Sequence, residues 1–387
     1  MRTPRAPLAA CVLVSIAALT GAFPSAQAPA LPSDLAGRID ALAAAELKKD
    51  GIGGATVGVV KGNALVWAKG YGLSNIEANT PATADTVYRI GSVTKPFTAL
   101  MLLQLVERGQ VRLSDPVERY LPEIGRVAGR FENSPPVTLF QLATMTSGLA
   151  REPDDLQTFL VGRVEEWEQV MLRALERTKY AHEPGTRYLY SNIGYAILGA
   201  TLGRAAKRSF LDHMRREILA PLGMAHSDFL PTPAIQQTLA KGYDVRDGKP
   251  DGSRAEREHA GRGYKVPNGA LYTTIGDLAK FVALWLGEGP ESVLKRATIQ
   301  DNLSRVGSAS GDLRSGYGIG FQVRRRDRSV IYGHGGSVSG YRAHVSFDPV
   351  SKTGVIVLRN VGGGKYGVAA LAESILQAAT GETRTMQ

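Results

Sequence analysis

The segment Ser92-Val93-Thr94-Lys95 precedes an apolar stretch, Phe97–Arg108, which stops at Gly109. Apolar residues in that stretch recur with the 3.6-residue period of a helix, and glycine commonly follows the last helical residue. We therefore predict a helix that begins near Ser92. On such a helix Lys95 lies on the same face as Ser92, with Cβ atoms roughly 5–6 Å apart.

A serine and a lysine in this arrangement can act together in nucleophilic catalysis. A serine hydroxyl is a weak nucleophile until a neighbouring base takes its proton. Burial disfavours the charged form of a lysine, so a buried Lys95 amine could be that base. The start of the helix adds free N–H groups where an oxyanion would develop. The S-x-x-K pattern is short, however, and a capped helix with an incidental lysine is the alternative.

A second segment, Tyr190-Ser191-Asn192, stands at a loop-to-helix junction before the apolar stretch Ile193–Leu202. A tyrosine phenol can relay a proton, and an asparagine amide can hold a substrate carbonyl. The alternative is a turn in which Ser191 or Asn192 caps the helix.

A third segment, His334-Gly335-Gly336, is expected at the end of a strand and is followed by Ser337. Small residues let a backbone approach a ligand closely. A backbone N–H from this segment could then join that of Ser92 in an oxyanion hole. The alternative is a hairpin with the glycines in its turn.

The three segments, in this order, resemble the class C β-lactamase and D,D-peptidase superfamily of serine hydrolases, which also includes D-aminopeptidases and lactamase-like carboxylesterases. The resemblance covers about residues 35–380. Further phrases that support it are Tyr88–Lys95, Leu113–Pro122, Leu139–Leu149, His182–Gly185 and Pro221–Met224.

The resemblance implies a role for each matching residue. Ser92 would be the acylated nucleophile, Lys95 its base and Tyr190 the residue that passes the proton to the leaving group. Substrate would be held by Asn192, which orients the acyl side chain, and by His334, Gly335 and Gly336. The backbone N–H groups of Ser92 and Ser337 would form the oxyanion hole.

His334 stands where many relatives carry the lysine of a Lys-Thr-Gly motif. Free histidine, with a pKa near 6.5, is mostly neutral at pH 7. We therefore expect weak or absent β-lactamase turnover, with penicillins stalling at the acyl-enzyme. A literal Lys352-Thr353-Gly354 follows Asp348-Pro349 in a predicted turn, and we do not assign it to the site.

The distribution of strand and helix patterns predicts an α+β fold. An antiparallel sheet built from both chain termini carries flanking helices, and a mostly helical region is inserted between them. We expect one serine hydrolase domain at 31–380, with its α/β part at about 31–110 and 305–387 and its helical part at about 111–304. Helices are predicted at 33–50 (with Ser33 as N-cap), 138–145, 164–177, 193–206, 209–219, 275–286 and 366–379, and strands at 55–61, 65–70, 318–324, 329–333, 341–347 and 354–359.

The first 28 of the 387 residues resemble an export signal, with a basic start, an apolar core and small residues before a cut after Ala28 or Ala30. Cys11 precedes the apolar core, which argues against a lipoprotein. The mature chain would then lack cysteine and its disulfides. No other apolar run suggests a transmembrane anchor. We expect a periplasmic or secreted protein.

Other chemistries find little support in the sequence. G-x-S-x-G is absent, and the 6 histidines show no metal-ligand spacing. We expect no metal, no cofactor and no nucleic-acid partner, despite the net charge of +10. The expected substrate is a small peptide, ester or β-lactam, with peptidoglycan as a further candidate. A D,D-carboxypeptidase or D-aminopeptidase is favoured, and a carboxylesterase or a penicillin-binding module without efficient turnover are the alternatives. The natural substrate and the oligomeric state stay open.

Overall fold

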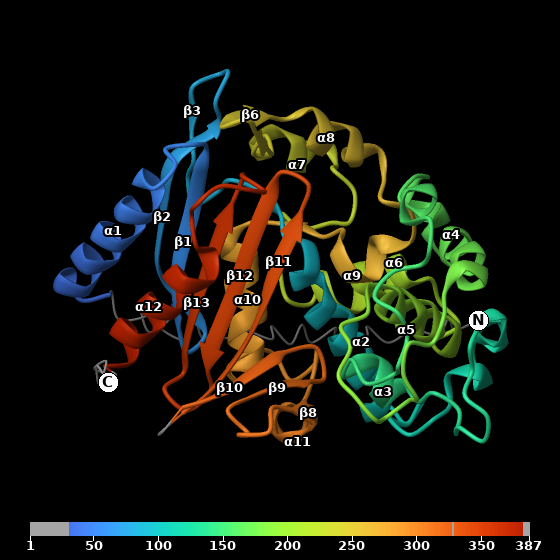
Figure 1. Cartoon of the computed structure of the whole chain (residues 1–387). Helices are drawn as coiled ribbons and strands as arrows, with labels where there is room; N and C mark the ends of the chain where they lie inside the picture. The colour runs from blue at the N-terminus through green and yellow to red at the C-terminus, as the bar shows by residue number, and fades with distance from the viewer. Residues whose placement is uncertain (1–30, 327–328, 382–387) are drawn as a thin grey trace, which may run out of the picture.

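A nine-stranded antiparallel sheet forms the centre of the computed structural model, which describes residues 31–326 and 329–381 (Figure 1). The predicted export signal and Cys11 lie outside these residues. The strand order is β3-β2-β1-β13-β12-β11-β10-β9-β8. The strands are β1 (Gly54–Lys61), β2 (Ala64–Asn75), β3 (Thr80–Pro81), β8 (Val306–Ala309), β9 (Ser315–Gly318), β10 (Gln322–Arg325), β11 (Val330–Val338), β12 (Tyr341–Asp348) and β13 (Thr353–Arg359). Because β1 pairs with β13, both ends of the chain build one sheet, as predicted.

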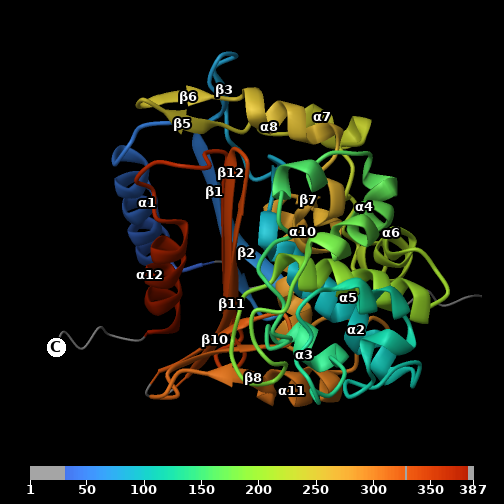
Figure 2. The ribbon, with the colours of Figure 1, turned by 45° about the vertical axis from the view of Figure 1, so that its right-hand side comes forward.

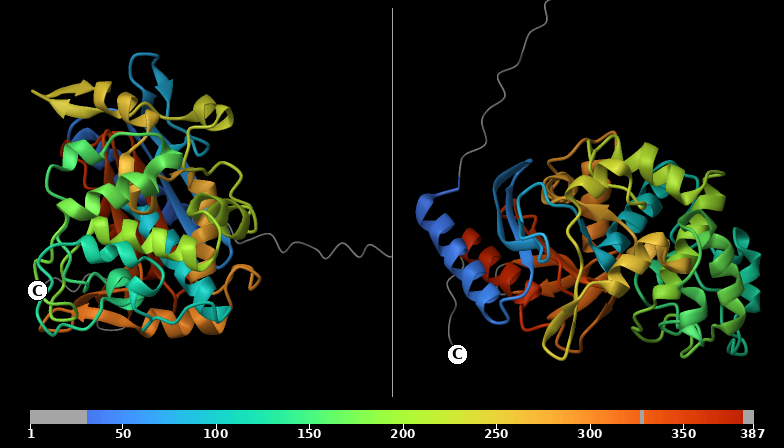
Figure 3. Two further views of the ribbon diagram at one scale, coloured as in Figure 1. Left: turned by 90° about the vertical axis from the view of Figure 1, so that its right-hand side faces the viewer. Right: turned by 90° about the horizontal axis from the view of Figure 1, so that it is seen from above.

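Helices cover both faces of this sheet (Figures 2 and 3). Helices α1 (Ser33–Lys48) and α12 (Val368–Thr380) lie on one face, and α10 (Ile275–Trp285) and the helical region lie on the other. The sequence of β13 explains why both faces of the sheet are covered, because its apolar residues alternate between two cores. Val355 and Val357 pack with α1 and α12, whereas Ile356 and Leu358 belong to the core of the helical side.

The helical side is organised around two apolar helices, α2 (Lys95–Glu107) and α5 (Asn192–Ala205). Both are buried over most of their length, which explains why apolar residues occupy all their faces. The other helices there are α3 (Leu139–Ala143), α4 (Trp167–Ala174), α6 (Phe210–His213), α7 (Pro233–Thr238), α8 (Ser253–Arg257), α9 (Val266–Gly269) and α11 (Arg296–Ser304). The helical side also contains two short β-ribbons. These are β4–β7 (Tyr88–Arg89 with Tyr272–Thr273) and β5–β6 (Asp244–Arg246 with Lys249–Asp251).

The α+β fold is confirmed, but several predicted boundaries are wrong. Ser33 is the first residue of α1 and makes no capping hydrogen bond. The predicted helix 209–219 is present, but it consists of α6 followed directly by a π-helix, Met214–Leu219. The predicted strand 318–324 is a hairpin, because β9 ends at Gly318 and Gly320 takes a φ of 85° before β10 begins.

The glycines of His334-Gly335-Gly336 lie inside a strand, contrary to our prediction of a strand end. Strand β11 continues through them to Val338, and the three residues pair with Val345, His344 and Ala343 of β12. The turn comes later, at Gly340, where φ is 76°. Glycine in a strand interior often marks a place where another backbone approaches closely.

Lys352 lies in the β12–β13 turn, as predicted, with a φ of 52°. Its Nζ donates to the carbonyl of Leu286 and lies 3.3 Å from a carboxylate oxygen of Glu288. In residues 31–326 and 329–381, we find no helix with the length and apolar character needed to cross a bilayer.

Candidate active site

Ser92 lies in a 3-10 turn, Gly91–Thr94, which leads directly into α2. The predicted helix is therefore confirmed, with its α-helical part starting at Lys95. A Cβ on Gly91, whose φ is 51°, would lie 2.8 Å from the backbone of Ser337. A Cβ on Gly336 would lie 1.9 Å from the carbonyl oxygen of Ile90. Both glycines thus allow the serine turn to lie directly against β11, which brings Ser92 and Ser337 together.

The amine of Lys95 is buried directly beneath the Ser92 hydroxyl. Nζ donates to Asn192 Oδ1 at 2.8 Å and to the carbonyl of Asn268 at 3.1 Å, and it forms a third hydrogen bond, of 3.1 Å, with Ser92 Oγ. Three hydrogen bonds therefore fix the amine in one position. Ser92 itself is partly exposed, in contrast to the fully buried Lys95.

Burial lowers the pKa of Lys95 well below its usual value. The positive charge of Lys265 lowers it further, whereas the negative charge of Glu152 acts in the opposite direction. An amine with a depressed pKa is neutral more of the time near pH 7 and can accept the proton of a hydroxyl 3.1 Å away. The geometry therefore places a candidate base beside the Ser92 hydroxyl.

Asn192 connects Lys95 to a carboxylate that the sequence did not indicate. Its Nδ2 donates to Glu152 Oε1 at 2.7 Å, while its Oδ1 accepts from Lys95. Glu152 also accepts from Lys265 Nζ at 2.9 Å and from the Tyr264 hydroxyl. Burial would raise the pKa of Glu152, but Lys265 and these hydrogen bonds outweigh it and hold the pKa below its usual value. Glu152 is therefore ionised at neutral pH.

Two basic side chains lie near the ring of Tyr190. Lys95 Nζ is 4.7 Å and Arg151 Cζ is 4.8 Å from the centroid of its ring. Burial raises the pKa of Tyr190, and a hydrogen bond with the Ser92 side chain opposes this rise. Ser191 accepts from Gly194 N–H and so caps α5, as one of our alternatives proposed. The cap fixes Tyr190 and Asn192 on either side of it.

His334 is buried and has partners for both ring nitrogens. Nδ1 lies 2.7 Å from the carbonyl oxygen of Gly335, and Nε2 lies 2.9 Å from the hydroxyl of Tyr317. Because a carbonyl only accepts, Nδ1 carries the proton and Nε2 accepts from Tyr317. Burial, together with the charge of Lys95, lowers the pKa of His334 to about 3. The imidazole is therefore neutral at pH 7.

The predicted site residues thus fall into two groups. Ser92, Lys95, Tyr190 and the backbone of Ser337 are gathered at one place, with Gly336 packed beneath the serine turn. Asn192 and His334 lie beside them but are buried, with their polar atoms bonded within the protein. Their predicted role in binding substrate stays a prediction, and the structure gives each a part in holding a neighbour.

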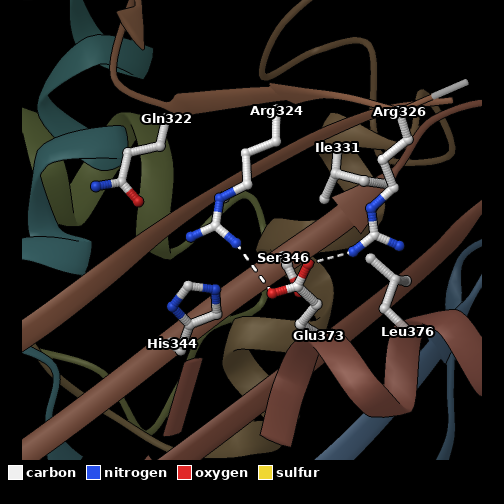
Figure 4. Close-up of a pocket in the computed structure, with 9 residues that line it drawn as sticks. Gln322, Arg324, Arg326, Ile331, His344, Ser346, Glu373 and Leu376 are labelled. Carbon is white, nitrogen blue, oxygen red and sulfur yellow. Dashed lines mark hydrogen bonds and ion pairs between the residues drawn. The ribbon is translucent and has the colours of Figure 1, made fainter. Parts of the chain in front are cut away.

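A pocket on the opposite face of the sheet has a different character (Figure 4). Its floor is His344 and Ser346 of β12, and Glu373 of α12 pairs there with Arg324 and Arg326. It lies on the α12 side of the sheet and contains none of the predicted site residues. Among the residues that the structure describes, no three His, Cys, Asp or Glu side chains form a group that could hold a metal ion.

Comparison with known proteins agrees with this geometry. The family model described as Beta-lactamase matches residues 39–380, so the chain belongs to the Beta-lactamase family. This family lies in the serine β-lactamase and transpeptidase superfamily that the sequence resembles.

Solved and curated relatives place the chain more closely. A penicillin-binding protein homologue from Pyrococcus abyssi, described as octameric, shares 27% identity and a TM-score of 0.76 over 90% of this chain and 78% of that one. Beta-lactamase-like protein 2 of Dictyostelium discoideum is 30% identical over 82% of this chain and 58% of its own length. Protein flp of Staphylococcus aureus (strain COL) is 26% identical over 86% of this chain and 64% of its own length. The chain thus spans less than two thirds of these two curated relatives.

Proposed function

We propose that this protein is a serine hydrolase that forms an acyl-enzyme on Ser92 and cleaves amide or ester bonds of peptide-like substrates. One observation carries the proposal: a fully buried lysine amine, with its pKa depressed, lies 3.1 Å from the hydroxyl of a partly exposed serine. Family membership supports it, because the superfamily is one of serine hydrolases.

In acylation, Lys95 takes the proton of Ser92 as Oγ attacks the substrate carbonyl carbon. The C–Oγ bond forms, and the carbonyl oxygen gains negative charge near the N–H groups of Ser92 and Ser337. Tyr190 then relays the proton to the leaving nitrogen or oxygen as its bond to carbon breaks. A water molecule repeats the sequence on the acyl-enzyme, which releases the acid and restores Ser92.

We favour a D,D-carboxypeptidase or D-aminopeptidase over a carboxylesterase. The neutral, buried His334 supports our expectation of slow β-lactam turnover, because it offers no positive charge to the carboxylate of a penicillin. We also propose that residues 1–28 direct export to the periplasm or out of the cell, on the pattern of that segment alone.

The test is to incubate the purified protein with p-nitrophenyl acetate and with a fluorescent penicillin. We expect ester turnover that Ser92→Ala abolishes, and a penicillin adduct that persists. Ser304→Ala, which changes an exposed serine on α11, is the matched control and should behave as the wild type. Penicillin binding without turnover of any ester or D-amino-acid peptide would instead support a binding module. Ester turnover that survives Ser92→Ala would refute the proposal.

A further inference from the structure

Glu152 gathers donors from three separate segments beside the catalytic lysine. Asn192 Nδ2 and Lys265 Nζ donate to its Oε1 at 2.7 and 2.9 Å, and the hydroxyl of Tyr264 donates to its Oε2. Glu152 itself does not touch Ser92. It can therefore contribute to the reaction only indirectly, through these partners or through its charge.

The first contribution is the orientation of an amide. An asparagine side chain can present either its oxygen or its nitrogen to a neighbour. Because an ionised carboxylate only accepts, the Asn192 nitrogen must face Glu152, and the oxygen is left for Lys95 at 2.8 Å. With the amide reversed, the Asn192 NH₂ would face the Lys95 amine and its oxygen would face the carboxylate. Glu152 thus determines which atom Lys95 meets.

The second contribution is charge. The charged groups that act most strongly on Lys95 are Lys265, Arg151 and Arg262, which lower its pKa, and Glu152, which raises it. Burial already lowers the pKa of Lys95. A base whose pKa falls too far loses its strength as a proton acceptor, so an opposing anion keeps the amine effective.

We propose that Glu152 is a positioning residue for acylation: it orients Asn192 so that Lys95 Nζ is held in line with the Ser92 hydroxyl. This inference rests on the proposed function. It extends that function by a residue that reaches the nucleophile only through Asn192 and Lys95.

Glu152→Gln tests the proposal, because glutamine keeps the shape but loses the charge and can donate. We expect kcat for ester hydrolysis to fall about tenfold with KM little changed. Lys95 must be deprotonated to act, so activity falls as pH drops through its pKa. Without the anion that pKa is lower, and the acidic limb of kcat/KM should move to lower pH. Glu152→Asp keeps the charge and should leave that limb in place.

Glu256→Gln, which removes an exposed carboxylate on α8, controls for the loss of one charge and should leave kcat and the pH profile unchanged. A crystal structure of Glu152→Gln gives a readout that does not depend on turnover, and we expect Lys95 Nζ to have lost its contact with Asn192 Oδ1. An unchanged contact, or an unmoved acidic limb in an active variant, would overturn the inference. A wild type that hydrolyses none of the substrates would refute the proposed function. The crystal structure of Glu152→Gln would then still test whether Glu152 orients Asn192.

An independent observation concerns Arg151, the residue before Glu152. Its guanidinium is exposed and lies over the ring of Tyr190. Within the described part of the chain, no carboxylate forms an ion pair with it, since Glu152 is taken by Lys265. Its carbonyl accepts from the N–H of Asn192 at 2.9 Å, so its backbone is fixed to the start of α5. An exposed cation is thus held next to the proposed proton relay.

From this geometry we infer that Arg151 is a specificity residue that favours substrates carrying a carboxylate. A guanidinium binds a carboxylate through two parallel hydrogen bonds, which a neutral ester group cannot accept with the same strength. This inference also rests on the proposed function.

The test compares mono-p-nitrophenyl glutarate with its methyl ester. The wild type should prefer the free acid, and Arg151→Ala should lower kcat/KM for the acid about tenfold more than for the methyl ester. Arg38→Ala, at an exposed position on α1, controls for net charge and should leave the preference unchanged. Equal losses on both esters, or a wild type without the preference, would overturn the inference. Loss of all turnover in Ser92→Ala tests the proposed function separately.

Discussion

Two short segments that each start with a basic residue type and end in glycine, His334-Gly335-Gly336 and Lys352-Thr353-Gly354, occupy very different places in the sheet. The first lies inside β11, where its backbone touches the serine turn and its imidazole is buried. The second begins in the β12–β13 turn and continues into β13, and the Lys352 side chain contacts Leu286 and Glu288, just after the end of α10. The second segment matches the Lys-Thr-Gly motif of many relatives residue for residue, yet of the two segments it is the first that lies near Ser92. Position in the sheet, rather than residue type, selects the segment that serves the site.

The largest expected effect comes from breaking the close approach of β11 to the serine turn. A Cβ on Gly336 would meet the carbonyl of Ile90 at 1.9 Å, and backbone cannot yield as a flexible side chain can. Gly336→Ala should therefore displace Ser92 and lower kcat/KM for ester hydrolysis by about 100-fold or more.

Its matched control is the neighbouring glycine. A Cβ on Gly335 would lie 3.6 Å from His344 Nδ1, an ordinary contact. Gly335→Ala should retain most of the activity. If both variants keep wild-type kcat/KM, the close approach is not needed for catalysis, and the comparison of the two segments loses its basis.

Acid should destabilise the protein through its buried imidazoles. Burial lowers the pKa of His334 to about 3, and those of His213, His259 and His344 to about 4. Below pH 6.5 the unfolded chain binds protons that the folded chain does not, so the free energy of unfolding falls as pH falls. Each histidine contributes about 1.4 kcal/mol per pH unit until its folded pKa is reached.

Urea denaturation at pH 7, 6 and 5 measures this slope. His334→Gln should reduce the slope of the free energy of unfolding against pH by the contribution of about one proton, whereas Lys352→Ala should leave the slope unchanged. A slope equal in the wild type and in His334→Gln would mean that His334 is protonated in the folded protein. That result would contradict the neutral imidazole described above.

A smaller effect should follow from Tyr317→Phe. The variant removes the hydroxyl that donates to His334 Nε2 at 2.9 Å and leaves a buried acceptor without its donor. We expect a loss of about 1–3 kcal/mol in the free energy of unfolding. Tyr188→Phe, a change at an exposed neighbouring ring, is the control. Equal stability of both variants would show that the Tyr317–His334 hydrogen bond contributes nothing.

The smallest effect is expected at the other segment. Lys352→Ala removes a half-exposed ion pair with Glu288 and a hydrogen bond to Leu286. Such surface contacts contribute up to about 1 kcal/mol, so a small decrease in stability and an unchanged kcat/KM are expected. A loss of ester hydrolysis in this variant would return Lys352 to the active site.

Local pattern was sufficient for much of the fold and for part of the site. The apolar period after Ser92 and the strand patterns at both chain ends predicted α2 and the sheet, because burial of each face leaves a regular trace in sequence. The glycines of β11 were predicted to end a strand. Gly336 is instead needed because the backbone of Ile90 packs against it, and that contact joins residues far apart in the sequence. Glu152 and Lys265 were missed because a lone charge predicts no partner. The position of Glu152 just after the segment Leu139–Leu149 was the only available signal.

The proposed acyl-enzyme is tested most directly by trapping it. The protein would be mixed with a penicillin, quenched in acid, digested and analysed by mass spectrometry. We predict one acyl group, attached to Ser92, which is absent from Ser92→Ala and forms more slowly in Lys95→Ala. An adduct on any other residue, or no adduct with penicillins, activated esters and D-amino-acid peptides alike, would contradict the account.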